Sequence, residues 1–229
     1  TSWTEVNDLN TARNGLAGVG TSTSSLAYGG EPITAVTESF NGTNWTEVND
    51  LNTARQNLSG AGVSNTSALA FGGGGPNTQT ELWNGTNWTE VNDLNAGRGY
   101  AAGFGTSTAA IFTGGLPATA ATESWNGTNW TEVNDLNTAR YHFAAAGIST
   151  AGLVFSGSPG APVAALTESW NGTNWTEVND MSIDRYGAAG AGVQTSALAA
   201  AGSRAVPAAL VSEEWTGAGA PLTKTITTS

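Results

Sequence analysis

Cysteine is absent from this chain of 229 residues, and histidine occurs once, at His142. The absence of cysteine excludes disulfide bonds and thiolate metal sites. One histidine leaves no partners for a multi-His metal centre or for a triad built on histidine. Charged residues are only 11% of the chain, and no run of 18 apolar residues occurs. The sequence therefore predicts no membrane insertion.

Positive charge is scarce as well, because 7 Lys and Arg face 18 Asp and Glu, for a net charge of −11. An acidic surface repels phosphate backbones and anionic lipid. We therefore expect no nucleic-acid partner. The nine Trp and the regular alternation of apolar residues argue against a disordered chain.

What is abundant is repetition. The stretch Asn-Gly-Thr-Asn-Trp-Thr-Glu-Val-Asn-Asp at 126–135 occurs, whole or in part, five times. The aligned tryptophans are separated by 42, 43, 42 and 45 residues, at Trp3, Trp45, Trp88, Trp130 and Trp175. A period of this size indicates stacked supersecondary units. Since the repeats follow one another without a linker, we expect a single domain over 1–229.

Each repeat reads as four short strands. In 139–180 the segments 139–147, 152–155, 164–170 and 174–178 are apolar or alternating, with turn residues between them. Asn-Gly, between the last two segments, is the strongest short hairpin signal. Helical periodicity is absent, so we predict an all-β, five-bladed β-propeller with four antiparallel strands per blade. The blades are expected at 12–50, 54–93, 97–135, 139–180 and 184–215.

Ring closure can be predicted from the two ends. The chain begins with a complete fourth strand at 2–7, whereas the fifth repeat stops after its third strand near Trp215. We expect residues 2–7 to complete blade five, because an unpaired edge is then removed. The tail 216–229 also alternates and competes for that edge.

The order of residues in each repeat resembles the kelch repeat. Arg13, Gly29-Gly30, Glu38-Ser39-Phe40 and Trp45 show that order. The diglycine becomes Ser156-Gly157 and Ala201-Gly202 in the last two repeats. The repeated sequence Asn-Gly-Thr-Asn-Trp-Thr-Glu-Val-Asn-Asp is also similar to kelch-like repeats of marine bacteriophage virion and tail proteins. That resemblance implies a virion or extracellular location.

The repeated Arg enters the first strand of every blade, at Arg13, Arg55, Arg98, Arg140 and Arg185. We expect these residues to form ion pairs with repeated carboxylates; the alternative is a ring of guanidinium groups that binds a ligand carboxylate.

The Asn-Asp-Leu-Asn loops offer oxygen ligands that suit Ca²⁺, although Asn and Asp also form turns unaided. Nearly all carboxylates recur in every copy, so we expect no catalytic residue, metal or cofactor.

The copies differ most just after the repeated Arg and in the loop between the second and third strands. Both loops are expected on one face. Loops on a rigid scaffold are where recognition is usually found, and neutral drift is the rival explanation. The candidate ligand-binding residues on this face are Tyr100, Tyr141, His142, Tyr186, Asn14 and Gln56.

These observations favour a non-catalytic binding module. The resemblance implies that it is a receptor-binding propeller of a phage virion or tail, which recognises a cell-surface glycan or protein. The alternative is a purely architectural protein that contacts neighbouring virion proteins without a ligand. A glycosidase-like propeller enzyme is the remote alternative, because it needs an asymmetric acidic pocket that the repeat columns do not supply.

Overall fold

The computed structural model describes residues 4–160, 163–203, 211–217 and 222–225. It divides into two compact units, Thr1–Gly99 and Tyr100–Ser229. Trp3 and most of the loop at 203–207 lie outside the described residues.

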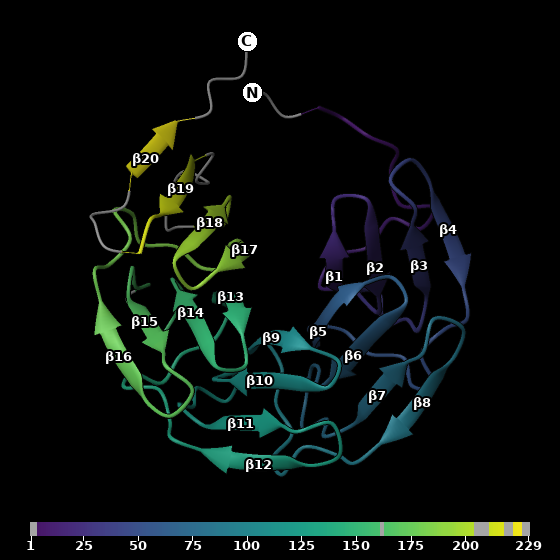
Figure 1. Ribbon diagram of the computed structural model, residues 1–229, viewed down its shortest axis with the longest axis horizontal. Helices are drawn as coiled ribbons and strands as arrows, with labels where there is room; N and C mark the ends of the chain where they lie inside the picture. Colours follow the sequence, from purple (N-terminus) through teal and green to yellow (C-terminus); the bar gives the residue numbers. More distant parts are fainter. Residues whose placement is uncertain (1–3, 161–162, 204–210, 218–221, 226–229) are drawn as a thin grey trace. The chain divides into compact units, whose positions relative to one another are not determined.

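Two antiparallel sheets make up the described part of the first unit (Figure 1). Their strands follow the chain in order, so each sheet is a meander. The bounds are β1 Ala17–Thr21, β2 Ser24–Tyr28, β3 Thr37–Phe40, β4 Trp45–Val48, β5 Ser59–Ser64, β6 Ser67–Phe71, β7 Thr80–Trp83 and β8 Trp88–Val91.

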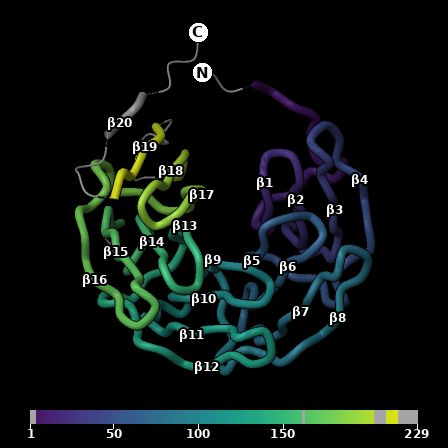
Figure 2. Tube along the Cα trace, viewed as in Figure 1, coloured from purple at the N-terminus to yellow at the C-terminus, as the bar shows by residue number. Residues whose placement is uncertain are grey.

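The described part of the second unit contains three sheets built in the same way, which can be followed along the trace in Figure 2. Their strands are β9 Ala102–Thr106, β10 Ala109–Thr113, β11 Thr122–Trp125, β12 Trp130–Val133, β13 Ala144–Ile148, β14 Ala151–Phe155, β15 Thr167–Trp170, β16 Trp175–Val178, β17 Ala189–Val193, β18 Ser196–Ala200, β19 Val211–Trp215 and β20 Leu222–Thr225. The all-β class and the five four-stranded blades are thus confirmed sheet by sheet.

The Asn-Gly turns form the hairpins that the sequence predicts. Gly42 has a φ of 93°, which a residue with a side chain rarely adopts. The Asn41 side chain stabilises its own turn, because its Oδ1 accepts hydrogen bonds from the amides of Thr43 and Asn44 at 3.0 and 2.9 Å. The same side-chain contacts recur at Asn84, Asn126 and Asn171. Each turn fixes the register of strands three and four.

Within each unit, the first strands of neighbouring sheets pack on each other: β1 on β5, β9 on β13, and β13 on β17. Small residues permit this approach. A Cβ at Gly60 of β5 would lie only 1.8 Å from the buried Tyr28 hydroxyl. That hydroxyl donates to the Leu69 carbonyl at 3.1 Å, so β2 and β6 are also joined across the two sheets.

The expected pairing of residues 2–7 with the fifth sheet is wrong. The strand beside β19 is β20, paired from Val211↔Thr225 to Glu214↔Leu222. Residues 4–9 contain no strand, and residues 1–3 lie outside the description. The physical reason is chain closure: β20 follows β19 after a short connection, and short loops lose less entropy on closing than long ones.

The N-terminal segment instead attaches to the first sheet. Asn7 Nδ2 donates to Asn44 Oδ1 at 2.6 Å, and Asn10 donates to Glu38 through its backbone amide and its side chain. Asn49 and Asn52 make the same contacts with the second sheet. In the described part of the chain, no helix is long and apolar enough to cross a membrane.

Candidate functional site

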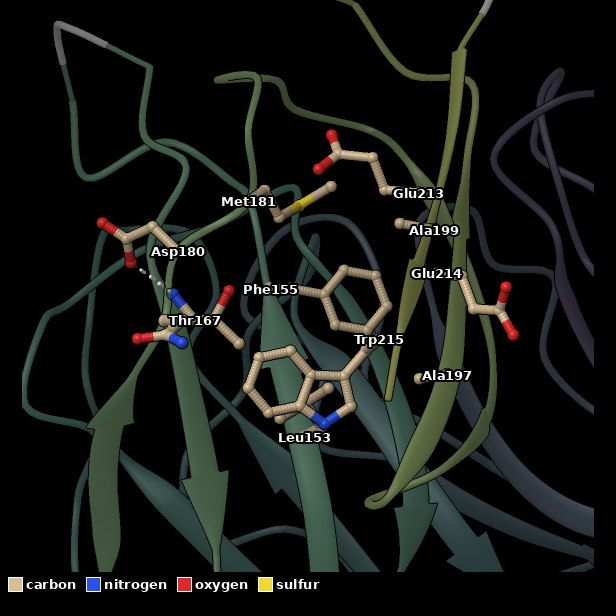
Figure 3. Close-up of a pocket in the computed structure, with 11 residues that line it drawn as sticks. Leu153, Phe155, Thr167, Asp180, Met181, Ala197, Ala199, Glu213, Glu214 and Trp215 are labelled. Atoms are coloured by element: carbon tan, nitrogen blue, oxygen red, sulfur yellow. Dashed lines mark hydrogen bonds between the residues drawn. The ribbon is translucent and has the colours of Figure 1, made fainter. Parts of the chain in front are cut away.

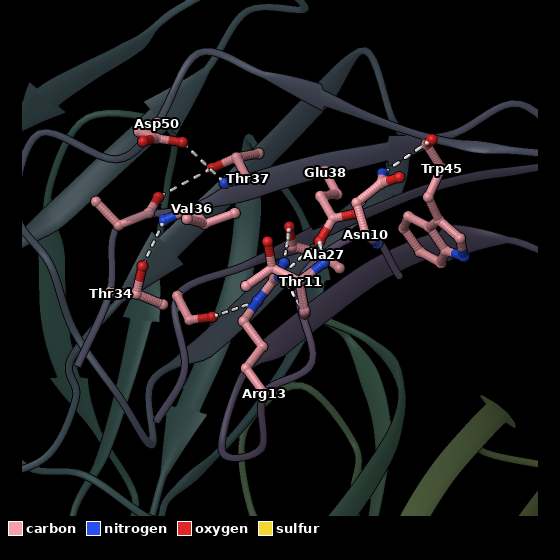
Figure 4. A network of polar contacts seen from close by, with 12 residues as sticks. Asn10, Thr11, Arg13, Ala27, Thr34, Val36, Thr37, Glu38, Trp45 and Asp50 are labelled. Carbon is pink, nitrogen blue, oxygen red and sulfur yellow. Dashed lines mark hydrogen bonds and ion pairs between the residues drawn. The ribbon is translucent and has the colours of Figure 1, made fainter. Parts of the chain in front are cut away.

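In the first, second, fourth and fifth sheets, a buried Arg–Glu pair joins the entry of the sheet to its third strand, as Figure 4 shows for the first sheet. Arg13 Nη1 lies 2.5 Å from Glu38 Oε1, and its Nε donates to the Gly29 carbonyl at 2.9 Å. The other carboxylate oxygen of Glu38 accepts from the backbone amide and side chain of Asn10, at 2.6 and 2.8 Å. Both carboxylate oxygens are therefore occupied within the protein.

The expected ion pairs recur in both units. Arg55 and Glu81 are 2.8 Å apart, Arg140 and Glu168 are 2.9 Å apart, and Arg185 pairs with Glu213. These side chains are at most 3% exposed, and Arg98 is buried as well. A guanidinium that is buried against a carboxylate of its own chain has no free face for a ligand. The repeated Arg therefore acts in the architecture of the sheets.

Electrostatics follow from this burial. Burial alone would raise the pKa of Glu38, but hydrogen bonds from Arg13, Asn10 and Thr11 outweigh it and hold that pKa below its usual value. Burial lowers the pKa of Arg55 and of Arg140, and the partner carboxylates oppose that change. Arg stays protonated at neutral pH even where burial lowers its pKa, so Arg55 and Arg140 carry their charge.

The Asn-Asp-Leu-Asn loops have structural partners. Asp50 Oδ1 accepts from the Thr37 amide at 3.1 Å, and its counterparts do the same for the amides of Thr80, Thr122 and Thr167. In the described ranges, no group of three or more His, Cys, Asp or Glu side chains is arranged to hold a metal ion. Each of these Asp side chains therefore binds the backbone at the start of the third strand, 13 residues earlier in the chain.

The second residue after each repeated Arg has a left-handed backbone. The φ angles of these residues, the left-handed column, lie between 53° and 65°: Gly15, Asn57, Tyr100, His142 and Gly187. Within the second unit, successive members are joined by backbone hydrogen bonds, His142 N to Tyr100 O at 2.8 Å and Gly187 N to His142 O at 2.7 Å. Glycine adopts this conformation freely, whereas an ordinary side chain costs about 1–2 kcal/mol. Tyr100 and His142 therefore occupy positions that favour glycine.

Around His142 the second unit gathers four rings, which we call the ring cluster: Tyr100, Tyr141, His142 and Tyr186. The His142 ring centroid lies 4.2 Å from that of Tyr100, 5.4 Å from that of Tyr141 and 6.0 Å from that of Tyr186. Tyr186 is 38% exposed, and the other three rings are partly buried. The four candidates of this unit thus form one contiguous, solvent-accessible aromatic surface.

The environment of the cluster favours the neutral form of His142. Partial burial lowers its pKa from the usual value near 6.5, because the charged imidazolium loses hydration. A neutral imidazole offers one donor and one acceptor nitrogen. The ring cluster therefore combines flat apolar faces with hydroxyl and imidazole groups that form hydrogen bonds.

The loops that hold the ring cluster lie on one side of their sheets, as expected. Tyr141 forms an isolated antiparallel bridge with Ser158, and Tyr186 forms one with Ser203. In each case the segment after the repeated Arg is joined to the loop after the second strand. These bridges fix the backbone beneath the rings, so the side chains project from a supported surface.

Asn14 and Gln56 belong to the first unit and take no part in the ring cluster. Asn14 is exposed and bridges Glu31, while the Gln56 carbonyl accepts from the Gly74 amide at 2.7 Å. Their role in binding stays a prediction. Among the repeated tryptophans, Trp88, Trp130 and Trp175 are buried and Trp45 is partly buried.

Sequence reasoning missed the left-handed column. The available signal was Gly15 and Gly187, which occupy the same repeat position as Tyr100 and His142. A scan against models of known protein families finds no match, and a search of curated proteins also finds none. The resemblance to kelch repeats therefore remains a prediction.

Proposed function

We propose that this protein is a non-catalytic binding module that recognises a carbohydrate through the ring cluster. The observation that carries the proposal is the use of Tyr100 and His142 in a left-handed backbone where two other copies have glycine. Backbone strain of this kind is concentrated at functional sites, where the surrounding structure maintains it. The strained residues here are the two whose rings stand at the smallest centroid distance within the cluster, 4.2 Å.

The chemistry of the cluster favours a neutral sugar. Aromatic side chains present a large apolar face together with a polar group that binds hydrogen-bond partners. Pyranose rings have apolar C–H faces edged by hydroxyl groups, so they match both properties. The net charge of −11 disfavours polyanionic ligands. Since three of the four rings are partly buried, little side-chain entropy is lost when the sugar binds.

The absence of catalysis is part of the proposal. Glycoside hydrolysis generally uses two carboxyl groups that flank the scissile bond. Glu38, Glu81, Glu168 and Glu213 are instead buried and paired with Arg. The ring cluster itself contains three phenols and an imidazole, and no carboxyl group.

We place this binding activity in a phage virion or tail, where it would attach the particle to a cell-surface glycan. Support for this location comes only from the sequence of the repeat and its similarity to phage virion proteins. A cell-surface protein is the other receptor class. An architectural role without a ligand becomes the better account if the ring cluster binds neither.

The test is a glycan array and a cell-binding assay with chains that carry Tyr100→Gly or His142→Gly. Glycine suits the backbone at both positions, so we expect the fold to survive while glycan binding falls at least tenfold. Asn57→Gly is the matched control, because it changes the same repeat position without removing a ring. Undiminished binding by both ring variants would refute the proposal.

A further inference from the structure

Aromatic side chains of the second unit also gather away from the ring cluster, at the interface between the fourth and fifth sheets. Figure 3 shows Phe155, Met181 and Trp215 packed there. The cavity that remains between them is about 20 Å³, which is too small for a sugar ring. This interface is therefore packed too closely to bind a carbohydrate, and the ring cluster is the place to look for one.

The ring cluster itself leaves only some ring faces open to a sugar. The Tyr100 and His142 rings have centroids 4.2 Å apart and planes inclined at 37°, so they are in contact and no ligand fits between them. Tyr141 packs on His142 from a second direction, at 5.4 Å and 60°. Tyr186 lies farthest from His142, at 6.0 Å, and is the most exposed of the four residues. The accessible part of the cluster is therefore the corner between His142 and Tyr186, which we call the aromatic corner.

Gly187 borders the aromatic corner. It follows Tyr186 directly in the chain, and its amide donates to the His142 carbonyl at 2.7 Å, so its backbone joins the two residues. A Cβ at Gly187 would meet no atom of the described residues within 4 Å. At Gly15, the same repeat position in the first unit, a Cβ would lie 2.7 Å from the Asn57 side chain. Glycine at position 187 therefore keeps the approach to the aromatic corner open, whereas the first unit fills the corresponding space.

The angle between the two rings of the corner limits how a sugar can stack there. The planes of His142 and Tyr186 are inclined at 75°. Two parallel rings can hold a pyranose by both of its faces, whereas two nearly perpendicular rings offer one stacking surface and one edge. A glucose-type ring has equatorial hydroxyls and exposes C–H groups on both faces. In a galactose-type ring the axial 4-hydroxyl makes one face polar and leaves C3–H, C4–H and C5–H together on the other. A corner with one stacking surface therefore suits the galactose configuration.

We infer that the aromatic corner binds a galactose-type pyranose, with the C–H face of the sugar stacked on one of the two rings. This inference rests on the proposed carbohydrate binding and adds to it the configuration of the sugar and its position. The imidazole of His142 and the hydroxyl of Tyr186 supply hydrogen-bonding groups for the hydroxyls at the edge of the sugar. Gly187 determines specificity, because a side chain at that position would occupy the space through which the sugar reaches the corner.

The probes are methyl β-galactopyranoside and its 4-epimer, methyl β-glucopyranoside, each titrated into the protein and observed by NMR. We expect the galactoside to bind with a Kd of about 1–10 mM and the glucoside to bind about fivefold more weakly or less. Saturation transfer from the protein should be strongest at the C3–H, C4–H and C5–H protons of the galactoside.

Gly187→Asn should weaken galactoside binding about tenfold, because the new side chain blocks the corner. The fold should survive, since Asn57 already has a φ of 53° at the same repeat position. Gly15→Asn is the matched control, the same substitution at the same repeat position outside the ring cluster. It should leave galactoside affinity unchanged, and a Cβ there meets the end of the flexible Asn57 side chain.

Equal affinity for the two epimers would overturn the inference, and so would undiminished galactoside binding by Gly187→Asn. If Gly187→Asn fails to fold, Tyr186→Ala decides, and unchanged galactoside affinity in that variant would contradict the assignment. The glycan array separates these failures from failure of the proposed function. If a glycan without galactose binds to the unmodified chain and is lost by His142→Gly, carbohydrate binding stands and the galactose assignment is wrong. If the unmodified chain binds no glycan, both are wrong.

Discussion

Replacing Arg55 by Met removes the cation from a fully buried ion pair while keeping most of the side-chain volume. The Glu81 carboxylate would retain only the Asn52 amide and side chain, at 2.7 and 2.8 Å. The Gly72 and Gln79 carbonyls, which accept from Arg55 at 3.0 and 2.8 Å, would lose those donors. The substitution therefore leaves the buried Glu81 charge without its cation and removes one donor from each carbonyl, although the Gln79 carbonyl still accepts from the Gly72 amide at 3.1 Å.

The expected cost is about 3 kcal/mol. Breaking a buried ion pair by removing one partner costs roughly 3–5 kcal/mol, and the two remaining Asn52 donors place this case near the lower limit. For a chain of this length, that loss corresponds to a fall in melting temperature of about 6–12 °C. Urea titration followed by circular dichroism measures the free energy of unfolding, and the unchanged slope of the transition checks that the same surface is exposed.

The double variant Arg55→Met with Glu81→Met tests whether the unpaired charge is the cause. It should be more stable than Arg55→Met alone, because no buried charge remains and the exposed Asn52 can bind water. Asp184→Asn, at an exposed position, is the control and should change stability by less than about 0.5 kcal/mol. A loss below about 1 kcal/mol in Arg55→Met, or a double variant no more stable than the single one, would refute the reasoning.

Three further predictions concern pH, packing and the sheet edge. Because the folded-state pKa of Glu38 is lowered, its contribution to stability is present above the usual carboxyl pKa near 4.3 and is lost as the pH falls through the lowered value. Urea titrations at pH 7, 4 and 3 should show this loss of stability. The Glu38→Gln variant should show a weaker dependence of stability on pH. Gly60→Ala should cost about 1–3 kcal/mol by pressing on the Tyr28 hydroxyl, and Tyr28→Phe should recover part of that loss in thermal melts. Deleting residues 222–229 should lower solubility and melting temperature more than deleting residues 1–8, because it exposes the edge of β19; equal effects of the two deletions would count against this pairing.

Local chemistry explains why so much of the fold could be predicted. Contacts between residues close in sequence determine the Asn-Gly turns, the alternation of the strands and the four-strand meander. The same sequence signals occur in successive repeats. The edge of the fifth sheet was predicted wrongly for a different reason. Residues 2–7 match the fourth strand of the repeat better than the tail does. Sequence similarity, however, contains no information about the entropy lost when distant ends of a chain are brought together.

The candidate site was only partly predictable. The sequence located the variable residues after the repeated Arg, and the structure brings four of them into the ring cluster. It gave no sign that Asn52 and Asn137 complete the Arg–Glu pairs, because the carboxylates that they bind are 29 and 31 residues away. The backbone geometry of Tyr100 and His142 also arises from hydrogen bonds between repeats rather than from local preference.

The most direct test of carbohydrate binding uses the fact that His142 is the only histidine in the chain. Its imidazole NMR signals are therefore assigned without ambiguity, and they report from the centre of the ring cluster. We predict that these signals titrate with a pKa below the usual value and shift progressively during addition of the strongest glycan from the array. The shift should reach saturation at the affinity measured for the whole protein. If that glycan binds while the His142 signals stay unchanged, its site lies elsewhere and the central claim is wrong.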